Sequence, residues 1–369
     1  MSSDAELTEL AVADLARLVN VESPSLDVAA ITRSAKAVAG LIGDWLGRPA
    51  RLVDGPAGPH VHWSGGGEPR VLVLGHHDTV FPIGTLATRP FKVDGGRATG
   101  PGVFDMKTGI VQAIHAVASL DDASGVELLF SADEEIGSET SRALIEERAL
   151  ACGAVLVLEP SADGGALKTG RKGVGTFEVI VRGRAAHAGL EPEKGVNALI
   201  EAAHQVLAIG VLGSAEHGTT VTPTVASAGT AENVVPAEAR IKVDVRVQER
   251  SEKERVEAAM AALSTVDPDA TIEVLGGINR PPMPETASAA LLPLAMRIDP
   301  TVVGVAVGGG SDGNFTAAVG VPTLDGLGAV GGGAHSDSEY VEVATIPGRI
   351  RLLAALLRQL CDGDGVRPA

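Results

Sequence analysis

Aromatic residues are scarce in this sequence. They make up 2% of the 369 residues, whereas hydrophobic residues as a whole make up 45%. The core must therefore be built from Ala, Val, Leu and Ile side chains. A chain of this length has room for a sizeable core and for roughly two or three domains.

Basic residues are also fewer than acidic ones. The sequence has 30 Lys and Arg against 47 Asp and Glu, which gives a formal net charge of −17. This charge argues against nucleic acid or an anionic membrane as a partner. No apolar run approaches the roughly 20 residues that span a bilayer, and the first residues lack the basic and apolar regions of a signal peptide. We therefore expect a soluble, cytoplasmic protein.

Cysteine is nearly absent. The two cysteines, Cys152 and Cys361, do not have the C-x-x-C spacing of redox or metal motifs. We interpret them as unpaired thiols of a reducing compartment and not as metal ligands.

The sequence is organised around residues 74–80, Leu-Gly-His-His-Asp-Thr-Val. They follow a run of branched apolar residues, 71–74, which predicts a buried strand. In open α/β sheets, ligands bind at the carboxyl ends of such strands. Because side chains alternate along a strand, His76 and Asp78 point to one side and His77 to the other. This pattern predicts His76 as a metal ligand and Asp78 as the carboxylate that orients its ring.

Further carboxylates follow other predicted elements. Apolar strands predicted at 126–130 and 154–158 each end in acidic residues, and a helix predicted over 107–120 begins close to Asp105. Strands that alternate with helices and end in carboxylates indicate a parallel sheet with its site at one edge. Asp133 alone is interpreted as a solvated strand end. The candidate site residues in this region are Asp105, Glu134, Glu135 and Glu159.

The pattern changes in the middle of the chain. Between residues 173 and 281 it predicts the order βαββαβ, which indicates a compact α+β insertion with one antiparallel sheet. Within it, Ser251-x-x-Glu254 is the pattern of a capping box at a helix start. We therefore predict an α/β fold in which residues 1–172 and 282–369 form one discontinuous domain. That domain would have a mostly parallel sheet flanked by helices.

The α/β pattern returns after the insertion. Strands predicted at 302–307 and 322–327 each lead into a glycine-rich loop, and the second loop is followed by His335. Two imidazoles, His76 and His335, together with several carboxylates suit Zn²⁺ or a similar divalent ion. Because each ion takes about four ligands, sharing one carboxylate would let this set hold two ions.

Five motifs together resemble those of one family. They are Gly-His-His-Asp-Thr-Val at 75–80, Gly-Pro-Gly-x-x-Asp-x-Lys at 100–107, Asp-Glu-Glu-x-Gly-Ser at 133–138, Glu-Pro at 159–160 and His-Ser-Asp at 335–337. The set is similar to that of the co-catalytic dizinc amidohydrolases and peptidases. That family includes acetylornithine deacetylase, succinyl-diaminopimelate desuccinylase, the aminoacylases and the bacterial glutamate carboxypeptidases. The resemblance is closest to the glutamate-carboxypeptidase-like branch.

The resemblance implies a role for each candidate ligand. Asp105 would bridge two Zn²⁺ ions, for which Co²⁺ or Mn²⁺ could substitute. One ion would also bind His76 and Glu159, and the other would also bind Glu135 and His335.

Two further residues have implied roles beside the metals. Asp78 would orient His76, and Glu134 would be the catalytic general base that takes a proton from water and delivers it to the leaving amine. Adjacent Glu134 and Glu135 can fill different roles only if strand alternation or a turn separates their side chains.

For the insertion, the resemblance implies a lid and homodimerisation domain of residues 173–281. The catalytic role implied for His187 is to reach the partner subunit's site and stabilise the oxyanion. Asn233 and Arg246 match positions that bind the substrate carboxylate. The alternative for Arg246 is a solvated sheet residue, although Arg suits bidentate carboxylate recognition. Further candidates for anion binding are Arg171 and Arg280.

We therefore predict a dizinc hydrolase that cleaves an amide or peptide bond next to a free carboxylate and releases a C-terminal amino acid. A glutamate-carboxypeptidase-like activity is favoured, and an N-acyl-amino-acid deacylase is the alternative because it would share the metal site. The substrate would be a small peptide or an N-acyl amino acid. A metal- or peptide-binding protein without turnover is disfavoured because it would need no free base such as Glu134.

Overall fold

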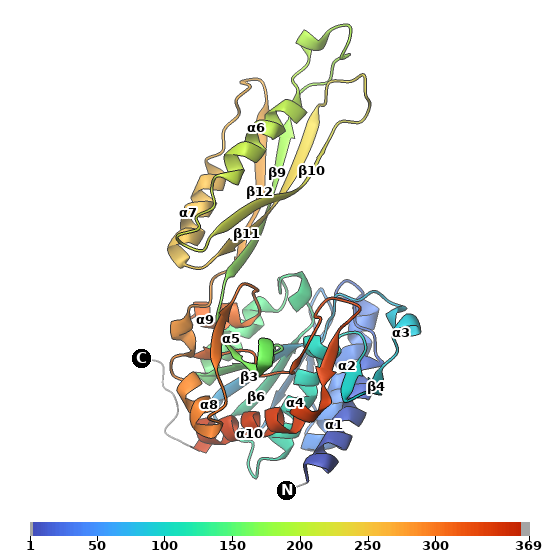
Figure 1. Ribbon diagram of the computed structural model, residues 1–369, viewed down its shortest axis with the longest axis vertical. Helices are drawn as coiled ribbons and strands as arrows, with labels where there is room; N and C mark the ends of the chain where they lie inside the picture. Colours follow the sequence, from blue (N-terminus) through green and yellow to red (C-terminus); the bar gives the residue numbers. More distant parts are fainter. Residues whose placement is uncertain (1–2, 363–369) are drawn as a thin grey trace. The chain divides into compact units, whose positions relative to one another are not determined.

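The computed structural model describes residues 3–362 and divides into two compact units (Figure 1). Unit 1 extends over Met1–Gly170, Pro284–Val307 and Ser311–Ala369, and unit 2 over Arg171–Met283 and Gly308–Gly310. The ends of the predicted discontinuous domain, residues 1–2 and 363–369, lie outside the described residues. Among the described helices, none is both long enough and apolar enough to cross a membrane.

A six-stranded sheet lies at the centre of unit 1. It consists of β1 (Arg51–Val53), β2 (His60–Ser64), β3 (Val71–His76), β6 (Val126–Ser131), β7 (Val155–Val157) and β14 (Thr323–Leu324). The strand order is β1-β2-β6-β3-β7-β14. The last four strands in this order run parallel, whereas β1 pairs antiparallel with β2, and β2 with β6. The predicted mostly parallel sheet is therefore confirmed.

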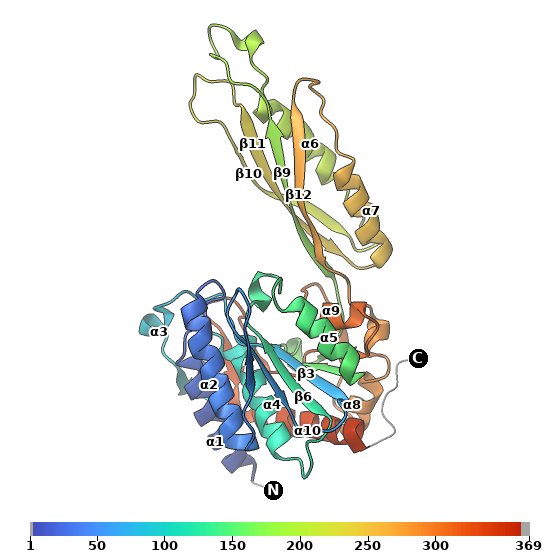
Figure 2. The ribbon, with the colours of Figure 1, turned by 180° about the vertical axis from the view of Figure 1, so that it is seen from behind.

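Helices cover both faces of this sheet (Figure 2). One face carries α1 (Asp4–Val19), α2 (Val28–Leu46), α4 (Thr108–Ala118), α8 (Leu292–Ile298) and α10 (Ile346–Asp362). The other face carries α5 (Arg142–Cys152) and α9 (Gly313–Ala318). Both faces are buried, which is typical of parallel sheets.

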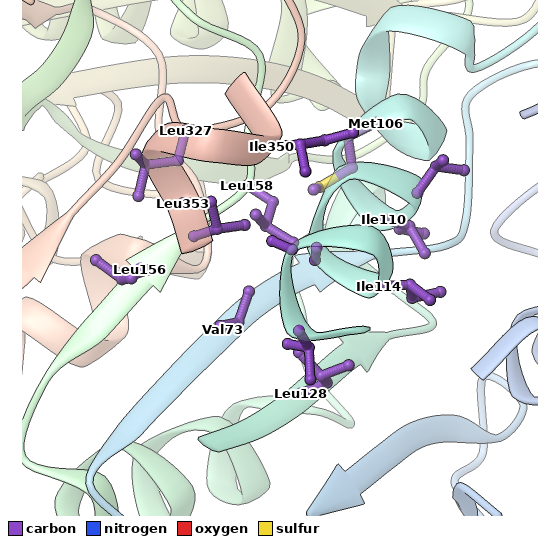
Figure 3. Close-up of a cluster of buried hydrophobic side chains, with 14 of the residues drawn as sticks. Val73, Met106, Ile110, Ile114, Leu128, Leu156, Leu158, Leu327, Ile350 and Leu353 are labelled. Atoms are coloured by element: carbon purple, nitrogen blue, oxygen red, sulfur yellow. The ribbon is translucent and has the colours of Figure 1, made fainter. Parts of the chain in front are cut away.

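The alternation of side chains in β3 explains why this strand is apolar throughout. Val71 and Val73 belong to the apolar cluster under α4 and α10, whereas Leu72 and Leu74 belong to the cluster under α5 and α9. Figure 3 shows aliphatic side chains from β3, β6 and β7 facing those of α4 and α10. As the composition predicts, aliphatic residues fill most of this core.

Smaller elements complete unit 1. A four-stranded antiparallel sheet has the order β15-β16-β5-β4, from β4 (Lys92–Asp94), β5 (Arg97–Thr99), β15 (Gly331–Gly332) and β16 (Tyr340–Glu342). The strand predicted at 302–307 is β13 (Gly304–Val307), which pairs with β8 (Leu167–Arg171) and not with the central sheet. The remaining short helices and turns are α3 (Thr85–Thr88), η1 (Val103–Lys107), η2 (Glu134–Ile136), η3 (Asp163–Gly165), η5 (Glu285–Ser288) and η6 (Val343–Thr345).

Unit 2 contains one four-stranded antiparallel sheet with two helices on one face (Figures 1 and 2). Along the chain its elements are β9 (Gly173–Arg182), η4 (Pro192–Lys194), α6 (Ala198–Gly210), β10 (Thr220–Ala228), β11 (Glu238–Val247), α7 (Arg250–Ala261) and β12 (Thr271–Arg280). The spatial strand order is β10-β11-β9-β12. The predicted βαββαβ order is confirmed, while the lid and dimerisation roles stay predictions.

Polar side chains fix several helix starts. The Asp27 carboxylate accepts a hydrogen bond from the amide of Ala30 at α2, and Asn197 accepts two amide bonds at the start of α6. The predicted capping box at Ser251 is wrong. Helix α7 already begins at Arg250, so Ser251 lies inside it, and its hydroxyl donates to the carboxylate of Glu249 instead of accepting a helix amide.

Candidate metal centre

Polar residues lie at or just after the carboxyl ends of three parallel strands, at one edge of the central sheet. His76 is the last residue of β3, Glu134 and Glu135 form η2 after β6, and Glu159 follows β7. The other two candidate ligands come from loops. Asp105 lies in η1, and His335 lies between β15 and β16. The structure thus brings all five predicted ligands and Glu134 together within unit 1.

Asp105 lies at the centre of this cluster. Its Oδ1 is 3.2 Å from Nε2 of His76, and its Oδ2 is 3.3 Å from Nε2 of His335. The His76 Nε2 atom is also 3.6 Å from Oε1 of Glu159, and the His335 Nε2 atom is 3.1 Å from Oε2 of Glu135. The side chains therefore form two groups that share the Asp105 carboxylate.

This donor set fits divalent metal ions. Ligand atoms of His76, Asp105 and Glu135 all lie within 4.8 Å of one another, as do those of His76, Glu134 and Glu159. Oε1 of Glu135 is buried and has no hydrogen-bond partner among the described residues. Imidazole nitrogens with carboxylate oxygens are ligands that Zn²⁺ and similar ions accept. The donor set therefore fits a divalent ion of this class.

The electrostatics of the cluster also favour bound positive charge. Burial alone would lower the pKa of His76, but its hydrogen bonds to Asp105 and Asp78 raise that pKa well above its usual value. The neighbouring carboxylates of Asp105 and Glu135 raise the pKa of His335 to about 10. Burial opposes ionisation of Asp105, yet the two histidines hold its pKa below the usual range. Carboxylates that keep both imidazoles protonated would equally stabilise a cation in their place.

Asp78 orients the residues around it. It is fully buried, and its Oδ1 lies 3.4 Å from Nδ1 of His76. Its carboxylate also accepts hydrogen bonds from the amides of Glu134 and Glu135, each at 3.2 Å, and from the Ser25 hydroxyl at 2.7 Å. One carboxylate thus holds both the imidazole ring and the turn that carries the two glutamates, as expected of a partner behind a metal ligand.

His77 lies outside the cluster. Its Nδ1 is 3.2 Å from the Ser34 hydroxyl and its Nε2 is 3.1 Å from the carbonyl oxygen of Pro59. Burial lowers the pKa of His77 to about 4, so this imidazole is neutral. The geometry supports His76 and not His77 as the ligand.

Asp133 is not a solvated strand end, and that interpretation is wrong. Its side chain is fully buried, and Oδ2 accepts hydrogen bonds from the amide and the hydroxyl of Thr140, both at 2.7 Å. The carboxylate therefore closes the turn of residues 133–140, which contains Glu134 and Glu135 and is called the glutamate turn below. It does so because it ties the start of that turn to its end.

Positive φ angles mark two loops of the cluster. Among the described residues, the non-glycine residues with φ in the left-handed region are Ser138, at 59°, and His335, at 61°. Such conformations cost of order 1–3 kcal/mol and persist where the surroundings enforce them. Ser138 donates to the buried carboxylate of Asp312, which also accepts from Ser131, and this fixes the end of the glutamate turn.

Unit 2 contains the remaining predicted site residues, in two groups. At one end of its sheet, the carbonyl oxygen of Asn233 accepts the amide of Ala188, so Asn233 lies beside His187. At the other end, Arg246 on β11 and Arg280 on β12 both pair with Val174 of β9, and Arg171 lies just before that strand. The sequence did not indicate this separation.

Arg246 and Arg171 both have partners within unit 2. Arg246 forms a bidentate contact with Asp244, with nitrogen–oxygen distances of 3.1 and 3.0 Å. Arg171 is buried, and its Nη1 donates to the carbonyl oxygens of Gly309 and Gly310. A hollow of about 570 Å³ lies at the other end of the unit, lined by residues that include Ala188, Asn197 and Thr230–Glu232.

Three buried residues around the centre were not predicted from the sequence. Ser25 contacts Asp78, Asp312 contacts the glutamate turn, and Glu339 contacts the loop of Asp105. Glu339 follows the His-Ser-Asp motif closely, and this spacing was a usable signal. The contacts of Ser25 and Asp312 depend on distant segments that only the fold brings together.

Known proteins resemble this chain along most of its length. The sequence model of Peptidase family M20/M25/M40 matches residues 72–359. The chain is 35% identical over 322 residues to Carboxypeptidase G2 of Pseudomonas sp. (strain RS-16), covering 81% of this chain and 76% of that protein. It is 29% identical over 303 residues to the succinyl-diaminopimelate desuccinylase of Methylibium petroleiphilum, covering 74% of this chain and 78% of that protein.

Solved structures share the fold. The M20 family metallo-carboxypeptidase Sso-CP2 of Sulfolobus solfataricus matches with a TM-score of 0.71 at 18% identity, covering 97% of this chain and 99% of that chain. The aminopeptidase PepT of Bacillus cereus also matches with a TM-score of 0.71, at 24% identity, covering 95% of this chain and 98% of that chain.

Proposed function

The chain belongs to peptidase family M20/M25/M40, and from that premise we propose that it is a two-metal carboxypeptidase. It would cleave an amide or peptide bond next to a free carboxylate and release the C-terminal amino acid. The observation that carries this proposal is the Asp105 carboxylate, whose two oxygens face His76 and His335 separately, with Glu134 close by. The 35% identity to Carboxypeptidase G2 supports carboxypeptidase activity as the proposed function.

Five residues would hold two Zn²⁺ ions, with Co²⁺ or Mn²⁺ as possible substitutes. Bound divalent cations would polarise the scissile carbonyl and lower the pKa of the attacking water. Asp105 would be shared, in the two groups that the contacts define. The ligands are His76, Asp105, Glu135, Glu159 and His335.

Glu134 is proposed as the general base. Its backbone amide is held by Asp78, and the residue is buried, with 7% of its surface exposed, so it is shielded from bulk water. A carboxylate in this position takes a proton from the attacking water and gives it to the nitrogen of the leaving amine. Glu135, which is held by the other oxygen of Asp78, faces His335 instead. The turn thus gives the two glutamates different neighbours.

His187 is proposed as a catalytic donor to the oxyanion. Its Nδ1 accepts the amides of Gly189 and Leu190, at 3.1 and 3.2 Å. Because Nδ1 is an acceptor there, the ring proton of the neutral imidazole lies on Nε2. A neutral His187 therefore presents an N–H group that can bind an oxygen on which negative charge develops.

The carboxylate end of the substrate is proposed to meet residues of unit 2. Arg246 and Asn233 are the first candidates, followed by Arg280 and Arg171. The Asp244 contact uses Nε and Nη2 of Arg246, and a guanidinium has five N–H donors, so further donors of Arg246 can bind a second carboxylate. We also propose that residues 173–281 form a homodimer interface and that the protein acts in the cytoplasm.

A second candidate function is an N-acyl-amino-acid deacylase. The similarity to a succinyl-diaminopimelate desuccinylase over 74% of this chain supports it. Both activities would use the same metal centre and base and would differ in the group that the substrate pocket accepts. A binding protein without turnover stays disfavoured, because it gives no task to Glu134.

A substrate panel tests the proposal. Metal-loaded protein is incubated with short peptides, including ones with C-terminal glutamate, and with N-acyl amino acids, and release of free amine is followed. Carboxypeptidase activity predicts release from C-terminal peptide bonds, whereas a deacylase releases amine only from simple acyl groups. The Glu134→Gln protein serves as the background control. Absence of amine release from every substrate class, with metal bound, would contradict the proposal.

A further inference from the structure

Glu339 is a buried carboxylate that has no part in the function proposed above. Its side chain is fully buried. Oε1 accepts the backbone amides of Phe104 and Asp105, and Oε2 accepts the amide of Gly102, all at 2.9 Å. The three donors come from the loop that carries the shared metal ligand, and one of them is the amide of that ligand itself.

The local fold explains why Glu339 reaches this loop. Strand β16 pairs with β5, and Tyr340 lies opposite Thr99. Glu339 therefore lies beside the segment that leaves β5 and turns through Gly102 toward Asp105. Because His335 lies in the loop just before β16, the same short segment carries one predicted ligand and anchors the backbone of another.

A shared ligand needs this kind of anchoring. Asp105 has two side-chain torsions, and its two oxygens must face His76 and His335 separately. Once the backbone of Asp105 is fixed, those two torsions are the freedom that remains. Without that restraint, a rotation or shift of the loop would move both oxygens together and weaken both halves of the cluster.

Burial raises the pKa of Glu339 to about 7, and the partners of this carboxylate offset part of the cost of burying it. Nη2 of Arg89 lies 3.9 Å from Oε2 of Glu339. The buried ammonium of Lys107, which donates to the carbonyl oxygen of Val21 at 2.8 Å, also attracts this carboxylate. A buried carboxylate is costly unless it is paired and hydrogen-bonded, and here it has both kinds of partner.

We propose that Glu339 is a positioning residue that presets the geometry of Asp105 as a ligand shared by two metal ions. It touches neither substrate nor metal and acts through the backbone of Asp105. This inference rests on the proposed two-metal function. Residues that hold ligands from behind typically contribute about 10- to 100-fold to metal affinity or activity.

The test compares Glu339→Gln with Glu342→Gln, the same substitution at an exposed position three residues further along. In Glu339→Gln the amide nitrogen cannot accept, so at least one of the three loop amides loses its acceptor. Zn²⁺ is titrated into the metal-free proteins by calorimetry, and bound zinc is measured by elemental analysis. Glu339→Gln should bind zinc about 10- to 100-fold more weakly and retain fewer ions, whereas Glu342→Gln should match the parent protein.

A double variant separates positioning from a general structural role. If Glu339 acts through Asp105, Glu339→Gln should weaken zinc binding in the parent protein but add little in an Asp105→Asn background. An equal loss in both backgrounds, or unchanged zinc affinity in a folded Glu339→Gln protein, would overturn the proposal. If Glu339→Gln does not fold, Glu339→Asp keeps the charge but withdraws the oxygens, and parent-like zinc binding by that variant would also overturn it. Failure of the parent protein to bind two ions would instead count against the proposed function.

Discussion

The neighbouring glutamates of η2 differ in their contacts, and this difference supports the proposal that Glu135 is a ligand and Glu134 the base. Glu135 lies 3.1 Å from His335, whereas Glu134 groups with His76 and Glu159. Asp78 binds both backbone amides, so the turn is held as one piece while the side chains diverge. The residue pattern predicts the pair, but only the family resemblance assigned a role to each residue, because the divergence of the side chains depends on a turn and not on strand alternation.

The first prediction concerns this pair. Glu134→Gln should lower turnover by about 10²-fold or more, because the amide cannot take a proton, while both metals remain bound. Glu135→Gln should instead weaken one metal site. Elemental analysis of both variants, together with rates of amine release, distinguishes the two roles. Loss of a metal from Glu134→Gln would show that this residue is a ligand.

The second prediction concerns the shared ligand. Asp105→Asn should damage both metal sites at once, because the amide nitrogen is a donor and can no longer face an ion. Asp121→Asn, at an exposed loop position, is the matched control and should keep the parent metal content. The metal-to-protein ratio after dialysis provides the measurement. Retention of one ion at full affinity would place the bridge elsewhere, and Glu159 would be the next candidate.

The third prediction concerns the two thiols, which are free in the structure. Burial raises the pKa of Cys152 to about 12 and that of Cys361 to about 11. Because the thiolate is the reactive form, both cysteines should resist alkylation by iodoacetamide at pH 8 in the native protein and react after unfolding in urea. Mass spectrometry of the alkylated peptides follows each thiol separately. Rapid labelling of native Cys152 would contradict this burial.

At the scale of elements, strands with continuous apolar runs were predictable and irregular segments were not. Leu72 and Val73 face different apolar clusters, so β3 is apolar at every position and is recognisable from its sequence alone. Asp133 and Ser251 were misinterpreted because their partners, Thr140 and Glu249, are set by how a turn closes and where a helix begins. The short strand β5 pairs with β4 on one side and with the distant β16 on the other, and a local pattern cannot indicate the second pairing.

Helix α6 and strand β10 together present an unpartnered surface on unit 2. Ile200, Leu207 and Val211 lie on one side of the helix and are 58%, 72% and 79% exposed. Strand β10 is an edge strand, and most of its side chains are exposed. An apolar helix face beside an open strand edge is a typical association surface. This surface supports the proposed homodimer.

The fourth prediction tests that surface. Leu207→Glu should convert a dimer into a monomer, because it would bury a charge without a partner at the interface. Glu254→Gln, at an exposed position of α7, is the control and should leave the assembly unchanged. Light scattering coupled to size-exclusion chromatography gives the mass of each variant. A parent protein that is monomeric at all concentrations would contradict the proposed interface.

At the scale of the whole molecule, the predicted function divides between two units. All proposed metal ligands and the base belong to unit 1, whereas His187 and the proposed carboxylate-binding residues belong to unit 2. The sequence could predict the ligands because strand ends place them together. The residue pattern alone gave His187 no role, since a histidine after a strand is usually a surface group, and its predicted role came from the family resemblance.

The last prediction tests whether His187 acts across the proposed dimer. His187→Ala should lower kcat by about 10²- to 10³-fold with unchanged metal content, because one donor to the oxyanion is lost. His217→Ala, at an exposed position of the same unit, should keep the parent rate. Mixing His187→Ala with Glu134→Gln protein should then restore activity. Each heterodimer contains one site with Glu134 from one chain and His187 from the other, so random exchange should recover about a quarter of the parent rate. If subunit exchange is demonstrated by mass and activity does not return, His187 acts within its own chain or has no catalytic role.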